Sequence, residues 1–438
     1  MVAISWPGHS QWPTLQKISF RFFCIYFLLY IQPWMWIEYI PYGNYITQYY
    51  YELINWLVLN ANRFLFNQYK ELIFPNGSGD TSYNWTQLWL YLLLALIGCL
   101  LWSIIDRKRT NYNRLSYWLR IFVRYFLIIN CFNYGIIKLF SLQMPFPNLS
   151  QLATPLGDYL PMRLSWMNMG YSTKYQFFSG AMEVLAGLLM LYRRTSTFGT
   201  LLAAGVFANV MVMNMSYDIP VKLYSTHLLI MCLYLLSFEY KRIVDFFVLN
   251  RATIAGNLYS VKFPKKWMRI SRIVLKCLFV LVVVILPFIN SRDRYYQVQN
   301  PREIKPIPAG IYDVSVYVLN KDTLPALITD TLRWQDMIFE KGGFGSIKTT
   351  DTMFRQRYRR GYFNYETDTA KNEISFKKTM VTGETFQLFK LRYNFPDSNT
   401  IHLIGTIRQD SVFAVLKKSK RHFQLAERQF HWLSEYNR

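Results

Sequence analysis

The sequence between Asn133 and His227 decides the fold of this chain. It begins with NYGIIKLFSLQMPFPN (133–148), continues through a Pro- and Trp-rich connector, and ends with two apolar segments joined by NMSYDIPVKLYSTH (214–227). Ionisable side chains lie at or near the ends of these apolar segments. Such groups are costly to bury in a membrane, and they usually pair with one another or line a path or site. We therefore expect a membrane domain with a buried polar site here.

The composition predicts two unlike domains. The chain has 438 residues, of which 52% are hydrophobic and 18% aromatic. This is too apolar for an ordinary soluble enzyme of this charge. Almost all the apolar segments lie before residue 290, and the sequence that follows is polar and strand-like. We predict a transmembrane helical domain over 1–290 and a β-rich domain outside the cytoplasm over 291–438.

The formal net charge of +23 raises the question of nucleic-acid binding, which requires a basic surface. Much of the excess charge, however, lies in two linkers, 106–120 and 241–276, directly beside hydrophobic segments. Basic residues at such positions set the orientation of a membrane protein and contact anionic headgroups. The sequence thus favours membrane lipids as partners and argues against nucleic acid.

About seven segments have the composition of membrane spans, although several are near the short limit of ~17 to 25 residues. They are 18–40, 88–105, 115–140, 175–192, 198–214, 222–238 and 270–290. The stretch 45–66 carries more polar groups at helical spacing, and it predicts an amphipathic helix lying on or partly in the membrane. The expected first domain is a polytopic helical bundle.

Basic residues occupy alternate loops, as a consistent topology requires. They follow the second, fourth and sixth predicted spans, at Arg107 to Arg114, at Arg193 and Arg194, and at Lys241 to Lys266. Such loops face the cytoplasm. We expect a multi-pass protein of the cytoplasmic (inner) membrane, with a cytoplasmic N-terminus and a periplasmic C-terminal domain.

The opposite, outward side of the bundle is where the candidate site residues gather. The candidates for proton transfer or catalysis are Lys138, Glu183 and His227, and the candidates for ligand binding are Asn133, Asn209, Asp218 and Lys222. Each has a simpler interpretation: Asn and His side chains often hydrogen-bond a neighbouring helix, lysines snorkel to headgroups, and Asp218 can cap a helix. Glu183 is the exception, because a carboxylate that deep requires a partner or a proton.

The connector 141–174 is too long for a simple turn and is rich in Pro, Gly, Trp and Met. Non-helical backbone at membrane depth is tolerated only where protein or a water-filled cavity surrounds it. We expect it to fold as a lid over the outer end of the bundle, with Asp158 and Arg163 closing the site. The five cysteines form no Cys-x-x-Cys, and the histidines beyond residue 400 are too scattered for a metal motif.

The sequence after residue 300 contains short β-rich runs separated by Gly, Asn and Asp turns. They are GIYDVSVYVLN, MFRQRYRRGYFNYE, NEISFKK, TFQLFKLRYNF, TIHLIGTI and SVFAVLKK. This pattern predicts a meandering antiparallel β-barrel or β-sandwich.

Within 115–238 the chain resembles the DoxX-like integral membrane family. The resemblance rests on YGIIKL (134–139), QMP (143–145), GAME (180–183) and GLL (187–189) before two arginines. It implies a helix that ends in a lysine, Lys138, followed by a helix with a glutamate, Glu183. It also implies quinone- or thiol-linked redox chemistry, with a quinone-like lipid as the cofactor to consider.

A more distant similarity is to the HTTM membrane domain of the vitamin K-dependent γ-glutamyl carboxylase. That domain also has a span ending near Lys-Leu and a β-rich domain on the outer side. The similarity implies that Lys138 is a base, but the rest of the carboxylase pattern is not evident.

Two functions remain open from the sequence. The first is a quinone- or lipid-linked redox enzyme whose site opens to the outer leaflet. The second is a non-catalytic envelope protein that anchors a periplasmic β-rich domain, which binds a protein or glycan partner. Transport is a weaker third interpretation, because no inverted repeat or matching pair of broken spans is evident.

Overall fold

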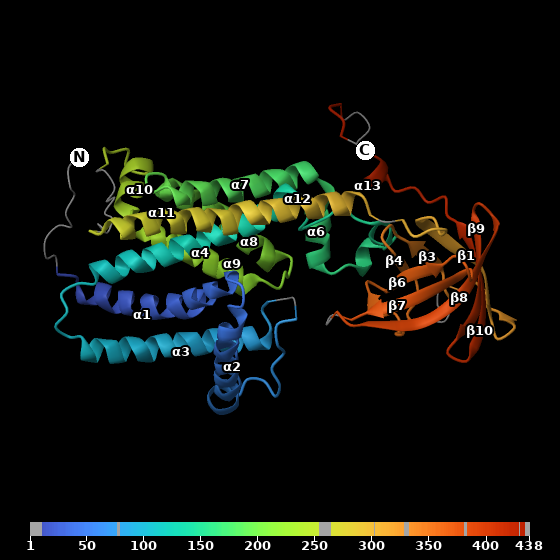
Figure 1. The fold of residues 1–438 in the computed structure, drawn as a ribbon, viewed down its shortest axis with the longest axis horizontal. Coiled ribbons are helices and arrows are strands. Elements are labelled where there is room, and N and C mark those ends of the chain that lie inside the picture. Colours follow the sequence, from blue (N-terminus) through green and yellow to red (C-terminus); the bar gives the residue numbers. More distant parts are fainter. Residues whose placement is uncertain are drawn as a thin grey trace. The chain divides into compact units, whose positions relative to one another are not determined.

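The computed structural model describes residues 11–433 apart from 77–78, 254–263, 302, 328–332, 381–382 and 429. It divides into two compact units (Figure 1). The first contains Met1–Pro145 and Ser172–Tyr295, and the second contains Phe146–Tyr171 and Tyr296–Arg438. Most of the connector thus belongs to the same unit as the β-rich sequence.

The first unit is a bundle of helices. In chain order these are α1 (Thr14–Ile31), η1 (Pro33–Tyr39), α2 (Asn44–Ala61), η2 (Asn62–Phe66), α3 (Ser82–Ile105), α4 (Asn113–Leu139), α7 (Thr173–Leu191), α8 (Ser196–Ser216), α9 (Lys222–Ser237), α10 (Tyr240–Phe247), α11 (Lys266–Val280), η4 (Leu281–Ile285) and α12 (Leu286–Gln299). Helix α4 is central, because it packs against α1, α7, α9 and η4. Its face toward these helices is correspondingly apolar and buried.

Five helical stretches of the described residues are long and apolar enough to cross a membrane, and a sixth is present if α9 and α10 form one bent span. The five are Thr14–Glu38, Ser82–Ile105, Asn113–Leu139, Ser196–Ser216 and Lys266–Gln299. The predicted class, a polytopic helical membrane bundle, is confirmed, but the expected count of about seven is too high. The predicted span 175–192 corresponds to α7, whose hydropathy is lowered by Lys174, Gln176 and Glu183.

Helix α2 corresponds to the predicted amphipathic helix 45–66. It runs across the direction of α1 and α3 (Figure 1). Tyr45, Tyr49 and Trp56 are among its exposed side chains. An orientation across the spans, with exposed aromatic rings, is typical of a helix that lies along a membrane surface.

The second unit contains a closed antiparallel barrel of eight strands. The ring consists of β1 (Gly310–Leu319), β3 (Asp336–Phe339), β4 (Phe344–Ile347), β6 (Arg360–Asp368), β7 (Glu373–Thr379), β8 (Thr385–Asp397), β9 (Thr400–Ile407) and β10 (Asp410–Lys418), and β10 pairs back onto β1. Two short strands, β2 (Asp322–Thr323) and β5 (Arg355–Arg357), pair with β1 and β6 outside this ring. The predicted antiparallel β-rich domain is therefore confirmed, as a barrel.

Aromatic side chains fill much of the barrel core. The ring of Phe376 lies 5.0 Å from that of Phe363 and 4.8 Å from that of Phe389. Burial alternates along β8 and β9, as expected when one face of a strand points into a core. An eight-stranded barrel is just wide enough for side chains to fill its interior.

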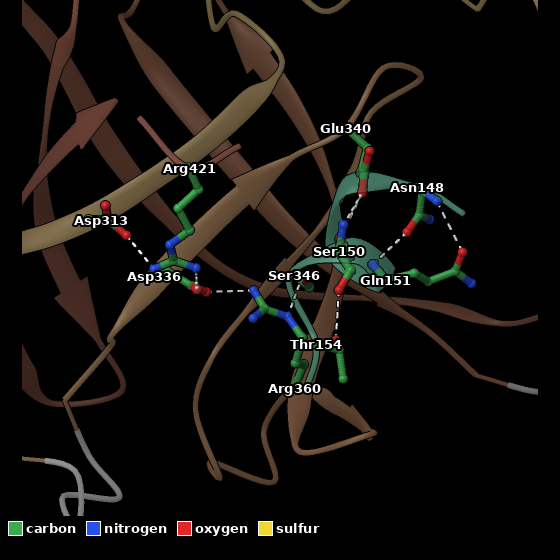
Figure 2. Close-up of polar contacts among 10 residues, drawn as sticks. All are labelled: Asn148, Ser150, Gln151, Thr154, Asp313, Asp336, Glu340, Ser346, Arg360 and Arg421. Carbon is green, nitrogen blue, oxygen red and sulfur yellow. Dashed lines mark hydrogen bonds and ion pairs between the residues drawn. The ribbon is translucent and has the colours of Figure 1, made fainter. Parts of the chain in front are cut away.

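The connector packs against the barrel. It contains α5 (Leu149–Leu152), η3 (Leu156–Asp158) and α6 (Pro161–Tyr171). The Glu340 carboxylate accepts hydrogen bonds from the backbone N–H and the hydroxyl of Ser150, at 2.7 and 2.8 Å (Figure 2). Both residues are buried, so these bonds fix the start of the connector.

The two polar residues that we expected to close the bundle site have barrel partners. Asp158 forms an ion pair with Arg359 at 3.2 Å. The Nε of Arg163 donates a hydrogen bond to the Tyr358 hydroxyl at 3.2 Å. Their contacts assign these side chains to the packing of the second unit.

An ion network with a buried centre joins several strands of the barrel (Figure 2). Arg360 donates to Asp336 at 2.6 Å and to Ser346 at 2.9 Å. Arg421, beyond β10, donates to Asp336 at 2.9 Å and to Asp313 at 2.5 Å. Since Arg360 and Asp336 are almost fully buried, each requires the other.

Candidate functional site

The candidate site begins where α4 and α7 approach each other at two glycines. A Cβ atom on Gly180 would lie 2.6 Å from the carbonyl oxygen of Gly135, and one on Gly135 would lie 3.0 Å from the carbonyl oxygen of Gly180. Only the absence of a side chain lets the two backbones come this close. Lys138 and Glu183 each lie three residues after one of these glycines, so both fall near the crossing.

Lys138 and Glu183 form a buried ion pair across this crossing. The distance between Nζ and Oε1 is 2.5 Å, and the side chains are 7% and 1% exposed. The second carboxylate oxygen, Oε2, is buried and has no hydrogen-bond partner among the described residues. The Lys138 ammonium also lies 5.8 Å from the centre of the Tyr134 ring. The pair therefore has one unused acceptor and an aromatic neighbour.

His227, on α9, is held by three contacts. Its Nδ1 lies 2.6 Å from the Leu223 carbonyl oxygen, its Nε2 lies 2.5 Å from the Tyr26 hydroxyl, and its ring stacks on Tyr30 at 4.0 Å. A carbonyl oxygen only accepts, so Nδ1 carries a proton. In the neutral ring Nε2 then accepts from Tyr26, and the ring orientation is fixed.

Beside His227 lies a cavity of about 410 Å³ within the bundle. Four helices, α1, α3, α4 and α9, contribute side chains to its wall. Most of these side chains are aromatic rings or amides: Tyr30, Tyr91, Phe126, Tyr134, Tyr224, His227, Gln32, Asn84 and Gln87. Tyr134 borders the cavity and also faces the Lys138 ammonium, so the cavity and the ion pair are neighbours.

The polar groups of the cavity wall are held in place by their own hydrogen bonds. The Tyr91 hydroxyl accepts from the amide of Gln32 at 2.7 Å and from the amide of Gln87 at 3.0 Å. The Tyr224 hydroxyl donates to the Asn130 side chain. A wall that is fixed in this way is suited to binding a rigid ligand without reorganisation.

Asp80 closes one end of the cavity and caps α9. Its carboxylate accepts hydrogen bonds from the backbone N–H groups of Lys222 and Leu223, at 2.6 and 2.9 Å. The sequence allows Asp218 as the cap of this helix, but Asp218 instead pairs with the Lys222 ammonium at 2.7 Å and is 80% exposed. The loop before α3 thus fixes the start of α9.

The structure places the predicted site residues in separate groups. Lys138 and Glu183 form the ion pair, and His227 lines the cavity. Asp218 pairs with Lys222 at the start of α9, where the Asp218 side chain is exposed. The two predicted amide ligands, Asn133 and Asn209, have exposed side chains and belong to neither group. The seven predicted residues therefore do not form one common site in the bundle.

The tyrosines and glutamines of the cavity were missed in the sequence. With 33 tyrosines in the chain, no single one stands out. A usable signal was the spacing of Gln87 and Tyr91, which places the two side chains on one face of a helix. No sequence pattern points to Gln32 as a residue of the cavity wall, because its position depends on the left-handed conformation that Gln32 itself adopts at the end of α1.

The basic loops lie together at one end of the bundle. The turn after α7 meets the start of α4, since Arg193 donates a hydrogen bond to the Tyr117 hydroxyl at 2.9 Å. The end of α9 meets α4 nearby, since the Arg120 guanidinium lies 4.7 Å from the Phe238 ring. The α3–α4 loop lies at this same end (Figure 1).

The fold and the site define a class of protein: a multi-pass membrane-type helical bundle with a buried ion pair and an aromatic cavity, followed by a β-barrel domain. The chain belongs to the family of YwoB. It is 32% identical over 125 residues to the uncharacterized protein YwoB of Bacillus subtilis (strain 168), a match that covers 28% of this chain and 79% of that protein. No family model and no solved structure matches the chain.

Proposed function

We propose that this protein is a DoxX-like integral membrane protein whose cavity binds the ring of a quinone-like lipid. The observation that supports the proposal is the cavity itself, which is lined by Tyr30, Tyr134, Tyr224 and His227. Its volume of about 410 Å³ is in the usual range for small-molecule sites. Its position among apolar helices favours a ligand that arrives from the lipid.

Aromatic walls and fixed polar groups suit a flat ring that carries carbonyl oxygens. Aromatic pairs contribute about 0.5 to 1.5 kcal/mol beyond the burial of apolar area. Gln32 and Gln87 each use one amide hydrogen for the Tyr91 hydroxyl and keep a second that can be donated to a carbonyl oxygen, as can the hydroxyls of Tyr30 and Tyr134. A simple hydrocarbon chain would offer no acceptor to the remaining donor hydrogens, which makes it a poorer ligand.

The enzymatic form of this proposal is reduction of the quinone to a quinol. That step requires two electrons, which two thiols of a reductant supply as they are oxidised to a disulfide, and two protons, which go to the two carbonyl oxygens. One proton is proposed to come from the Tyr26 hydroxyl, which donates to Nε2 of the cavity-lining His227. The Lys138–Glu183 pair provides a second, next to Tyr134.

Binding is tested with the purified full-length protein in detergent and a short-chain ubiquinone, whose binding is followed by quenching of tryptophan fluorescence. Y134L removes one ring from the cavity wall and should weaken binding about tenfold, from the lost stacking and hydrogen bonding. N209L changes an exposed residue outside the cavity and should bind as the wild type does. Quenching that does not saturate, or equal affinity in both variants, would overturn the proposal.

The redox step is tested in membranes that contain the full-length protein. Quinone reduction is measured for the wild type and for K138M, E183Q and H227N separately. A loss of turnover with retained binding supports proton transfer by the substituted residue. Wild-type turnover in all three variants rules out the redox step and leaves a binding protein.

We further propose that the protein lies in the cytoplasmic (inner) membrane, with its N-terminus in the cytoplasm and the β-barrel in the periplasm. The clustering of Arg107 to Arg114 and of Arg193 at one end of the bundle supports this orientation. Single cysteines at exposed positions of the barrel should react with a membrane-impermeant maleimide in intact spheroplasts. Reaction only after lysis would reverse the orientation.

The alternative function, a non-catalytic anchor for a periplasmic binding domain, is favoured by one feature of the barrel. All three residues of β5, including Arg355 and Arg357, are exposed. They offer a basic edge to an acidic protein or glycan. The charge reversal R355E/R357E should abolish cellular function if this is correct, while H227N should leave it intact.

A further inference from the structure

A second, smaller cavity lies at the basic end of the bundle, and the proposed quinone site does not involve it. Its volume is about 120 Å³. Arg120 and Arg124 of α4 and Arg193 of the turn after α7 line it, together with the first turn of α8. Three guanidinium groups on one small cavity repel one another, and electrostatic repulsion links each of them to the other two.

Neither arginine of α4 is paired with a described carboxylate, although the Glu239 carboxylate attracts Arg120 at longer range. No ion pair joins Arg120 or Arg124 to a carboxylate in the part of the chain that the structure describes. Glu239 also lines the cavity, but its carboxylate is already bound to Arg242 at 2.5 Å. The Nε of Arg124 is buried and has no hydrogen-bond partner among the described residues. A buried guanidinium donor of this kind requires an acceptor.

The start of α8 adds backbone donors to the same cavity. Thr195 stands at the cap position but makes no capping hydrogen bond from its side chain. The hydroxyls of Ser196 and Thr200 donate to the carbonyl oxygens of Arg193 and Ser196, at 3.0 and 2.8 Å, rather than accepting from the first turn. The helix has 21 residues, and the partial positive charge at its N-terminus favours an anion.

We propose that this cavity binds a phosphoryl group. Arginine guanidiniums match the geometry of phosphate oxygens, and the backbone donors of a helix N-terminus complete such a site. A volume of about 120 Å³ is well below that of a site for a nucleotide-sized ligand, so the cavity holds one tetrahedral anion. The group comes either from the headgroup of an anionic phospholipid or from free phosphate.

The simpler interpretation is that these arginines only set the orientation of the membrane domain. Basic residues that only set the orientation do not have to lie around one cavity. For that role, any Lys or Arg in the same loops has the same effect. Arg109, which is exposed in the α3–α4 loop at the same end, is therefore the matched control.

The test uses the full-length protein in an uncharged detergent at constant ionic strength. Inorganic phosphate is titrated against chloride, and the midpoint of thermal unfolding is followed. A second arm compares nanodiscs of phosphatidylcholine alone with nanodiscs that contain phosphatidate. An upward shift with phosphate identifies the free anion as a ligand, and a shift with phosphatidate alone identifies a lipid headgroup. Either result supports the site.

The variants decide whether the arginines are responsible. R124Q should weaken phosphate or phosphatidate binding about ten- to a hundredfold, the loss expected for a charge-assisted hydrogen bond, whereas R109Q should bind as the wild type does. R124K keeps the positive charge but lacks the planar guanidinium, so its affinity should lie between that of R124Q and that of R109Q. If R124Q does not fold, R120Q makes the same comparison. No shift with either ligand, or equal shifts in the wild type and the arginine variants, overturns the proposal.

Discussion

Substitution of Lys138 tests the ion pair at the α4–α7 crossing most severely. K138M keeps the length of the side chain but leaves the Glu183 carboxylate, which is 1% exposed, without its cation. Removing one partner of a buried pair typically costs about 3 to 5 kcal/mol, because the other charge stays buried. Since both side chains of this pair are under 10% exposed, we expect a loss in the free energy of unfolding near the middle of that range.

The double variant separates pairing from packing. In K138M/E183M both charges are gone, and apolar replacement of a buried pair is often neutral or stabilising. We therefore expect a coupling energy of about 3 kcal/mol in a double-mutant cycle. D218A, which breaks an exposed pair with Lys222, should change stability by less than about 0.5 kcal/mol.

The assay is equilibrium unfolding of the full-length protein in mixed micelles, followed by far-ultraviolet circular dichroism of the helices. The reasoning is refuted if K138M costs less than about 1 kcal/mol, or if the double variant loses the sum of the two single losses. Either result would mean that the two side chains are not paired in the dry interior.

Three further predictions concern packing, the barrel network and pH. G180A should destabilise the bundle by about 1 to 3 kcal/mol, because the added Cβ meets backbone at 2.6 Å. G205A, whose Cβ would have no atom within 4 Å, should be neutral or slightly stabilising in the same unfolding assay. D336L should cost about 3 to 5 kcal/mol in barrel stability measured by near-ultraviolet circular dichroism, since it leaves a buried arginine unpaired. Burial raises the pKa of Tyr312 and of Tyr365 from 10.0 to about 12. Because these hydroxyls ionise at lower pH in the unfolded chain than in the folded barrel, the barrel should lose stability as the pH rises from 10 to 12. The loss should be up to about 2.7 kcal/mol for each of the two tyrosines. Replacing both by phenylalanine should remove that part of the alkaline loss, and an unchanged alkaline midpoint would contradict the assignment.

Composition and alternation were sufficient to predict both domain classes. The six β-rich runs of the sequence correspond to β1, β5 with β6, β7, β8, β9 and β10. Strands β3 and β4 were missed for a physical reason. All four residues of β3 are buried, so the strand shows no alternation, and β4 is a four-residue strand that contains a glycine.

The candidate site was predictable only in part. Lys138 and Glu183 stood out because charges in apolar segments are rare, and their pairing follows from the glycine that precedes each by three residues. The prediction for Asn133 and Asn209 rests on their depth along the helix alone. In α8, apolar residues occur on every side of the helix. The depth of a residue along such a helix therefore does not show which side its side chain faces.

The connector shows a different limit of sequence reasoning. Its composition predicted folded but non-helical backbone, whereas the connector contains the 11-residue helix α6. Composition also does not indicate which surface the connector packs against. That surface depends on Glu340, whose carboxylate accepts two hydrogen bonds from Ser150, 190 residues earlier in the chain. Such long-range polar contacts leave no local pattern in the sequence.

The central claim, that a quinone-like ring occupies the aromatic cavity of the bundle, is tested most directly by photo-crosslinking. A short-chain azidoquinone would be irradiated with the full-length protein in lipid nanodiscs, and the labelled peptides identified by mass spectrometry. We predict labels on the cavity segments of α1, α3, α4 and α9, suppressed by excess unlabelled quinone. Labels confined to the exposed face of α8 or to the barrel, or labels that excess quinone does not suppress, would contradict the account.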